Sequence, residues 1–196
     1  MLEDCTKAIS ACGWFSRIRI NSPADAVGAG IAYLSEDRQK AGTILSFGMT
    51  ENISLISLGK YCAGPFLRKQ RETAAAEAYR DRFRIKAPSL RAPLRELSGG
   101  NQQKSAIAKS LDGAPRIFIF DEPTRGIDVN SRGEIYHFIH HLASGGMACI
   151  VISSDLEEII GLCSRTMVMR EGAAAGFLEG GRITEKEIMY LATGVK

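Results

Sequence analysis

The feature that most constrains the fold is a short apolar run that ends in two acids, IFIFDEPT at residues 117–124. Four apolar, β-favouring residues in succession predict a buried strand of a parallel sheet. Open α/β sheets bind ligands at the carboxyl ends of their strands, which is where Asp121 and Glu122 fall. The first acid can hold Mg²⁺, and the second can orient or deprotonate a water that attacks a phosphoryl group. The alternative is that both acids end a strand in solvent, because short motifs often occur by chance.

A second motif, LSGGNQQK at residues 97–104, precedes the apolar run. Ser98 is a favourable N-cap, and good helix formers follow from Gln102 onward. Gly99 and Gly100 carry no side chains that could cover the first turn, so its N–H groups and the positive end of the helix dipole face outward. This arrangement predicts an anion site that suits the terminal phosphate of a nucleotide. The alternative is an ordinary Gly-Gly turn ahead of a surface helix.

The order of these motifs, with GID at residues 126–128 after them, resembles the signature motif, Walker B motif and D-loop of ATP-binding-cassette (ABC) ATPases. The residues of these motifs are most similar to those in the second cassette of the tandem ATPases that drive bacterial ribose-, xylose- and galactoside-type sugar importers. The resemblance covers residues 21–196 and implies an α/β phosphate-loop NTPase cassette with a parallel sheet core. It places a helical subdomain at about 43–95 and the signature, Walker B, D-loop and C-terminal part at about 96–196. Residues 1–20 are expected to be an irregular or non-native lead.

The resemblance also implies roles for the motif residues. It assigns Asp121 to Mg²⁺ and Glu122 to catalysis. The residues expected to contact nucleotide within the signature motif and D-loop are Ser98, Gly99, Gly100, Gln102 and Asp128.

Two positions depart from the usual cassette. Glu36 stands where most cassettes have the Gln of the Q-loop, as in the second cassettes of sugar importers, and it could reach Mg²⁺ or its waters. An acid in a surface turn is an equal alternative. Ser154 stands where a His usually contacts the γ-phosphate, and serine carries no switchable positive charge. This departure argues against hydrolysis at this cassette's own site.

No Gly-x-x-x-x-Gly-Lys-[Ser/Thr] motif occurs in the 196 residues. Without it, a cassette has no backbone cradle and no Lys for the β- and γ-phosphates of ATP. In the family this loop precedes the Q-loop, so we expect the first strand, loop and helix to be missing. Ile119 and Val151 are then expected to lack packing partners, and stability alone is expected to be marginal. We also expect no ATPase activity from this chain by itself. ABC ATPases pair head to tail, however, so its signature motif can complete an ATP site on another cassette.

Charge, hydropathy and cysteine content limit the classes of partner and the cellular compartment that fit this chain. The formal net charge of +3 is too small to argue for nucleic acid, and no apolar run approaches the length of a membrane span. The five cysteines form no Cys-x-x-Cys pair and no secretory signal precedes them, which favours reduced thiols in the cytosol. The resemblance implies ATP and Mg²⁺ as cofactors. It implies permease subunits, another ATP-binding cassette and, indirectly, a periplasmic sugar-binding protein as partners, and a peripheral place on the inner face of the cell membrane.

Two alternatives to this function stay open. The chain could be a non-catalytic half-cassette that binds another ATPase or a permease, or it could be the product of a decayed gene.

Local patterns predict strands at 31–34 and 148–152, helices at 131–144 and 155–161, a hairpin at 166–178 and a capped helix at 184–192. His137 and His141 lie one turn apart near Glu134, a spacing that could suit a metal. Because no further ligands cluster there, we expect a solvated helix face.

Overall fold

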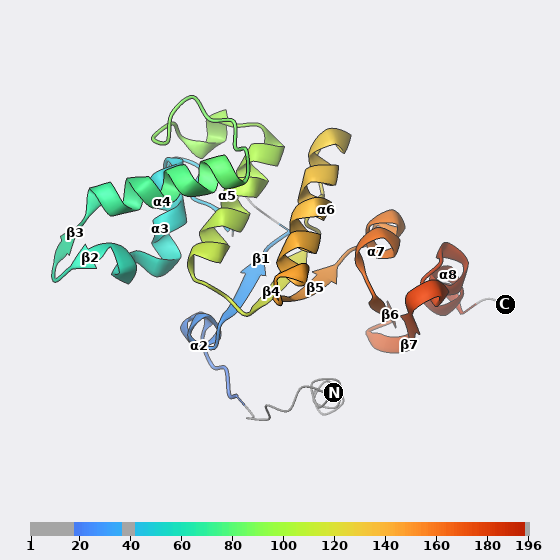
Figure 1. The fold of residues 1–196 in the computed structure, drawn as a ribbon. Coiled ribbons are helices and arrows are strands. Elements are labelled where there is room, and N and C mark those ends of the chain that lie inside the picture. The colour runs from blue at the N-terminus through green and yellow to red at the C-terminus, as the bar shows by residue number, and fades with distance from the viewer. Residues whose placement is uncertain (1–17, 37–41, 195–196) are drawn as a thin grey trace.

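The computed structural model describes residues 18–36 and 42–194 (Figure 1). Most of the expected irregular lead therefore lies outside the described residues. Its last three residues, 18–20, are exposed and have no regular secondary structure. The first helix among the described residues, α2 (Pro23–Gly28), begins as predicted: the Ser22 side chain accepts a hydrogen bond from the Asp25 N–H, and proline occupies the first helical position.

A parallel sheet of three strands forms the centre, in the order β1 (Ile31–Leu34), β4 (Ile117–Asp121) and β5 (Ala148–Ile152). All three were predicted from their apolar runs. Their register places Tyr33 beside Ile119 and Ile119 beside Ile150. Residues at these positions share one face of the sheet, because side chains alternate along a strand.

The other face carries the main core, beneath α5 (Gly99–Asp112) and α6 (Val129–Ser144) (Figure 1). Phe118 and Phe120 are fully buried there, and their stacked rings lie 4.1 Å apart. Both helices contribute apolar residues at helical spacing, including Ile107 and Ile135. Val151 is half-buried against this core, so the expectation that it lacks packing partners is wrong: its side chain points to the covered face.

The opposite face of the sheet is open. Tyr33, Ile150 and Ile152 are each exposed to 50% or more, and no element among the described residues covers them. Ile119 lies among them and is half-buried. Parallel sheets normally have both faces covered, so this exposure is unusual for the fold. It agrees with the expected loss of packing at Ile119.

The segment between β1 and α5 is mostly helical, as predicted. It contains α3 (Met49–Ser54), the 3-10 turns η2 (Leu55–Tyr61) and η3 (Leu94–Glu96), and α4 (Lys69–Arg82). Between them, β2 (Cys62–Ala63) and β3 (Phe66–Leu67) form a short antiparallel hairpin where a simple break was expected. A second core gathers here around Met49, Ile53 and Leu94.

The C-terminal part consists of α7 (Leu156–Leu162), the hairpin of β6 (Arg165–Arg170) and β7 (Ala173–Glu179), the turn η4 (Gly180–Arg182) and α8 (Glu185–Thr193). The hairpin and both helices confirm the sequence prediction. The Thr184 side chain accepts from the Glu187 N–H, as expected for its cap. A third core of Ile159, Val168, Leu178, Ile183 and Ile188 holds these elements together. Among the described residues, no helix has the length and apolarity that crossing a bilayer requires.

Candidate functional site

Two acids stand at the carboxyl end of the central strand. Asp121 is the last residue of β4, and Glu122 follows it with a left-handed φ of 45°. Two hydrogen bonds fix Glu122: its N–H donates to the Ile152 carbonyl at 2.8 Å, and its Oε1 accepts from the Ser154 N–H at 2.7 Å. A left-handed backbone costs a non-glycine residue free energy, so the fold holds this carboxylate at a definite place.

Tyr33 extends the acidic cluster. Its hydroxyl donates to Asp121 Oδ2 at 2.6 Å, and this hydrogen bond is the main reason that the pKa of Tyr33 is raised. Tyr33 was not predicted as a site residue. Its partner in the register is Ile119, two residues before Asp121, so Tyr33 and Asp121 share a face. An alignment of the two strands, read with the two-residue period, could have identified it.

Glu36 and Ser154 lie at the same edge of the sheet. Glu36 follows β1 and forms an ion pair with Arg125, which lies in the turn after Glu122. Both side chains are largely exposed, so the pair contributes little to stability. Ser154 meets Glu122 through its backbone N–H. The structure therefore gathers Asp121, Glu122, Glu36 and Ser154 in one region, which we call the carboxylate cluster.

The signature motif opens α5, a helix of 14 residues. Ser98 occupies the N-cap position as predicted, but its side chain makes no capping hydrogen bond; its Oγ accepts from Asn101 Nδ2 at 2.8 Å instead. The first turn holds no acidic residue, so the positive end of the helix dipole is not neutralised locally. Gln102 turns back and donates to the Leu97 carbonyl at 2.9 Å.

The D-loop packs against this helix start. Asp128 caps α6 by accepting from the N–H of Ser131 at 3.0 Å and from its Oγ at 2.8 Å. A Cβ added to Gly100 would lie only 2.6 Å from Ser131 Oγ. Gly100 is therefore needed for the close approach of α5 to α6. This contact brings Ser98, Gly99, Gly100 and Asp128 together, and we call them the signature cluster.

Buried polar side chains connect the two clusters. Gln103 is 2% exposed, and its Nε2 donates to the Pro123 carbonyl at 2.8 Å. Thr124 donates to Glu158 Oε1 at 3.0 Å, and burial raises the pKa of Glu158. These residues tie α5 and α7 to the turn after β4. Sequence reasoning missed them, because Gln103 and Glu158 look like ordinary polar helix residues until packing buries them.

The chemistry of the donors fits an ATP site only in part. Hard carboxylate oxygens suit Mg²⁺, and the start of α5 suits an anion. The described residues hold no group of three or more His, Cys, Asp or Glu side chains arranged for a metal ion, and the 196 residues contain no phosphate loop. The chain's own residues therefore do not make a complete site for ATP and Mg²⁺.

The fold and both clusters define an ABC-type cassette, and the family match agrees. Residues 16–125, more than half of the chain, match the family model described as ABC transporter, and the chain belongs to this family.

Curated proteins similar to this chain include sugar-import ATP-binding proteins. The chain is 43% identical over 178 residues to the ribose import ATP-binding protein RbsA 2 of Rhizobium meliloti, covering 91% of this chain and 35% of that protein. It is 42% identical over 180 residues to the xylose import ATP-binding protein XylG of Geobacillus kaustophilus, covering 92% and 36%. The chain thus spans about a third of the length of these relatives.

Solved structures confirm the fold. The ATP-binding cassette MJ0796 bound to ADP and Pi matches with a TM-score of 0.69 at 19% identity, over 82% of this chain and 68% of that one. The ADP conformation of the cassette MJ1267 matches with a TM-score of 0.66, also at 19% identity, over 89% and 69%. At this identity the likeness concerns the fold alone.

Proposed function

We propose that this chain acts in the ATP-binding component of a bacterial ABC sugar importer, where it contributes its signature motif in trans to a composite ATP site. The Walker motifs of that site lie on another cassette. The names of the curated relatives, which are ribose and xylose import proteins, support the transport class. The signature motif, Walker B motif and D-loop contact the nucleotide and not the sugar, so they do not indicate which sugar is transported.

The observation that carries the proposal is the preserved signature cluster. The start of α5 is held against the D-loop through Gly100 and Ser131, and no acid lies in its first turn. The Ser98 Oγ does not cap its own helix but accepts from Asn101 Nδ2, so its O–H can still donate to an outside anion. These features support a role in which the signature motif faces a partner's nucleotide, although the chain lacks a phosphate loop.

We further propose roles for the site residues within such an assembly. Ser98, Gly99, Gly100 and Gln102 face the phosphates of the partner's ATP, with Asp128 beside them. Asp121 is the Mg²⁺ ligand and Glu122 the water-orienting residue of this cassette's own half-site, where Glu36 and Ser154 also lie. That half-site does not hydrolyse ATP unaided, because no residues of this chain supply the cradle for the phosphates.

The remaining partners follow from the same proposal. The helical region at about 43–95 docks on permease subunits, which place the chain at the inner face of the membrane. A periplasmic sugar-binding protein is linked only through the permease. The net charge of only +3 gives no argument for nucleic acid as a partner.

Complex formation tests the proposal. The chain is mixed with the first cassette of a sugar-importer ATPase whose catalytic Glu is replaced by Gln, and the molar mass is measured by light scattering with and without ATP and Mg²⁺. We expect an ATP-dependent heterodimer that Ser98→Arg abolishes, because the added cation and bulk occupy the place of the phosphate. Ser144→Arg, at the exposed C-terminal end of α6, is the matched control and leaves the complex intact.

Two results would contradict the proposal. One is the absence of an ATP-dependent complex with the wild-type chain. The other is equal loss of the complex in both variants, which would show an effect of charge rather than of the signature motif. Binding to a permease without any ATP-dependent cassette pairing would favour the alternative of a non-catalytic binding module.

A further inference from the structure

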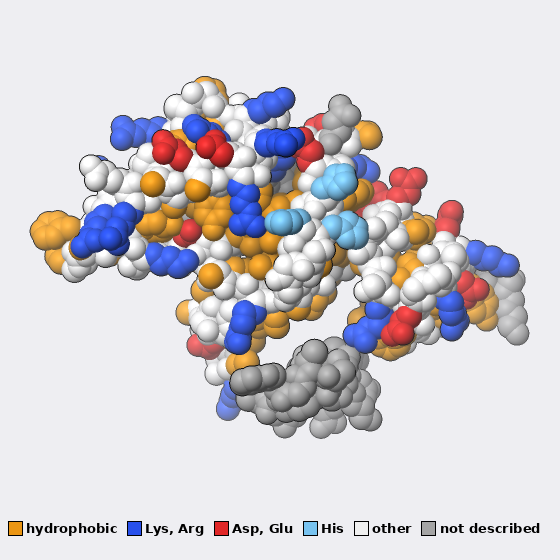
Figure 2. Space-filling view, in the orientation of Figure 1, with side chains coloured by type: hydrophobic (Ala, Val, Ile, Leu, Met, Phe, Trp, Pro, Cys, Tyr) orange, Lys and Arg blue, Asp and Glu red, His pale blue; other side chains and the backbone are white. Residues whose placement is uncertain are grey.

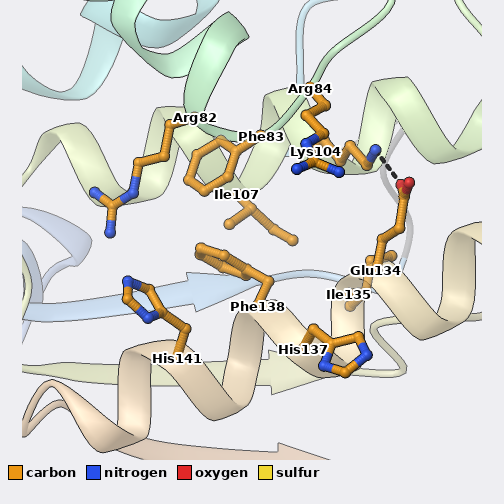
Figure 3. A pocket seen from close by; sticks show the side chains of 10 residues that line it. All are labelled: Arg82, Phe83, Arg84, Lys104, Ile107, Glu134, Ile135, His137, Phe138 and His141. Carbon is orange, nitrogen blue, oxygen red and sulfur yellow. Dashed lines mark hydrogen bonds and ion pairs between the residues drawn. The ribbon is translucent and has the colours of Figure 1, made fainter.

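An open groove lies on the surface between the end of α4, α5 and α6 (Figure 3). Its volume is about 430 Å³, within the range of pockets that hold small organic molecules. The proposed ATP chemistry uses none of the residues that line it.

The floor of the groove is apolar. The rings of Phe83 and Phe138 meet edge to face with centroids 4.7 Å apart, and the buried side chain of Ile107 lies beside them. Both phenylalanines pack against the main core and are only half-buried, so part of each ring remains accessible. Such a floor suits a flat apolar body, because aromatic rings offer large contact areas with preferred geometries.

Cationic side chains border this floor at both ends. Arg82 lies over the Phe83 ring at 5.6 Å, and Figure 3 shows it on the same side of the groove as His141. Arg84 and Lys104 stand at the other end, with His137 on the helix below (Figure 3). The space-filling view also shows histidines beside an apolar area with Lys and Arg side chains around it (Figure 2).

The charges at the groove do not cancel. Among the described residues that line it, Glu134 is the one acid, and Glu134 forms an ion pair with Lys104. Arg82 and Arg84 form no ion pair within the described part of the chain and leave two positive charges over. The pairing of Glu134 also removes the carboxylate that a metal site with His137 and His141 would need. An organic anion, rather than a metal cation, therefore complements this groove.

We propose that this groove binds an amphipathic organic anion, a carboxylate or phosphate joined to a flat apolar body. The apolar body lies on Phe83 and Phe138, and the anionic group faces Arg82 or Arg84. No residue of the carboxylate or signature cluster lines the groove, so this proposal does not depend on the proposed importer function.

The three histidines of the chain give a built-in readout. His137 and His141 line the groove, whereas His140 faces elsewhere and lies 3.2 Å from the Gly161 carbonyl. The full chain is titrated with 2-naphthoate, and the imidazole Hε1 signals are followed by NMR. We expect saturable shifts of the His137 and His141 signals, assigned by His→Gln variants, and no shift of the His140 signal.

Charge variants test the anionic part. Arg82→Gln with Arg84→Asn is expected to weaken naphthoate binding about tenfold or more, because both unpaired cations are lost. Asn tolerates the left-handed backbone of residue 84. Arg71→Gln, on an exposed position of α4 outside the groove, is the control and leaves binding unchanged. The neutral analogue 2-naphthylmethanol is expected to bind more weakly than naphthoate.

Three outcomes would overturn the proposal. They are shifts of all three histidine signals alike, naphthoate binding that the double variant does not weaken, and equal binding of the neutral analogue. The first would indicate nonspecific binding, for example to the open sheet face. The other two would show that the cations at the groove do not favour an anionic ligand.

Discussion

Gly100 has no room for a side chain. Gly100→Ala would place a methyl group 2.6 Å from Ser131 Oγ and 2.9 Å from its Cβ, so α5 must move away from the D-loop. Overpacking of this kind typically costs about 1–3 kcal/mol of unfolding free energy. We expect a loss in this range, measured by urea unfolding.

A second glycine provides the control for this prediction. Gly133 lies within α6, and nothing surrounds the position of its missing Cβ within 4 Å. Gly133→Ala is therefore expected to stabilise the chain by about 0.5–1 kcal/mol through helix propensity. If Gly100→Ala raised the unfolding free energy as Gly133→Ala does, the close contact between α5 and Ser131 would be wrong.

Glu158 predicts a dependence on pH. Burial raises its pKa in the folded state, so the folded chain binds a proton more readily than the unfolded chain. Stability from this group is then complete below its ordinary pKa of 4.5 and falls as pH rises through the raised value. Glu158→Gln keeps the acceptor for Thr124 and removes the buried charge.

The free energy of unfolding of the Gln variant is expected to exceed that of wild type at pH 7 and to equal it near pH 4, where the Glu158 carboxyl is protonated in both states. Urea midpoints at the two pH values measure this difference. A variant that is destabilised at pH 7 would show that the ionised carboxylate, and not its burial, governs this position.

At the scale of the elements, the sheet has one covered and one open face. Substitutions on the covered face should lower the free energy of unfolding more than substitutions on the open face. Phe118 is fully buried, so Phe118→Ala is expected to cost about 3–5 kcal/mol. Ile150, on the open face, is 50% exposed, so Ile150→Thr is expected to cost less than about 0.5 kcal/mol.

The same Ile150→Thr variant should aggregate more slowly than wild type, since an exposed apolar patch is an association site. Static light scattering against time measures this rate. A loss of stability at Ile150 close to that at Phe118 would mean that the open face is covered in solution.

Local patterns predicted most elements because they depend on near neighbours. The apolar run that forms β4, the Ser22 and Thr184 caps and the β6–β7 hairpin each carry their own signal. The contacts that shape the site depend instead on packing between distant segments. Tyr33 reaches Asp121 only through the register of two strands, and Gln103 meets Pro123 only after α5 has docked.

The α6 histidines show the same limit. His137 and His141 are exposed, as expected for a solvated face, yet they border a groove. The groove exists because Phe83 from the end of α4 packs on Phe138. No periodicity within α6 contains that information. The missing capping bond of Ser98 is similar, since Asn101 takes its hydroxyl instead.

At the scale of the whole molecule, the proposed function divides labour between two cassettes. The carboxylate cluster is assembled but has no phosphate loop within these 196 residues, and under the proposed function the signature cluster faces a partner cassette. Gln103, on the helix that carries the signature cluster, donates to the carbonyl of Pro123, the residue that follows Glu122. We therefore expect ATP hydrolysis by the paired cassettes to depend on Ser98 of this chain more than on its Glu122.

Steady-state ATP turnover tests this division of labour most directly. The chain is mixed with a cassette that has intact Walker motifs but an inactivated signature Ser, and the rate is compared for wild type, Ser98→Arg and Glu122→Gln. We predict that the wild-type chain restores turnover, that Glu122→Gln restores it equally, and that Ser98→Arg does not. Turnover by the chain alone, abolished by Glu122→Gln, would contradict the proposed division.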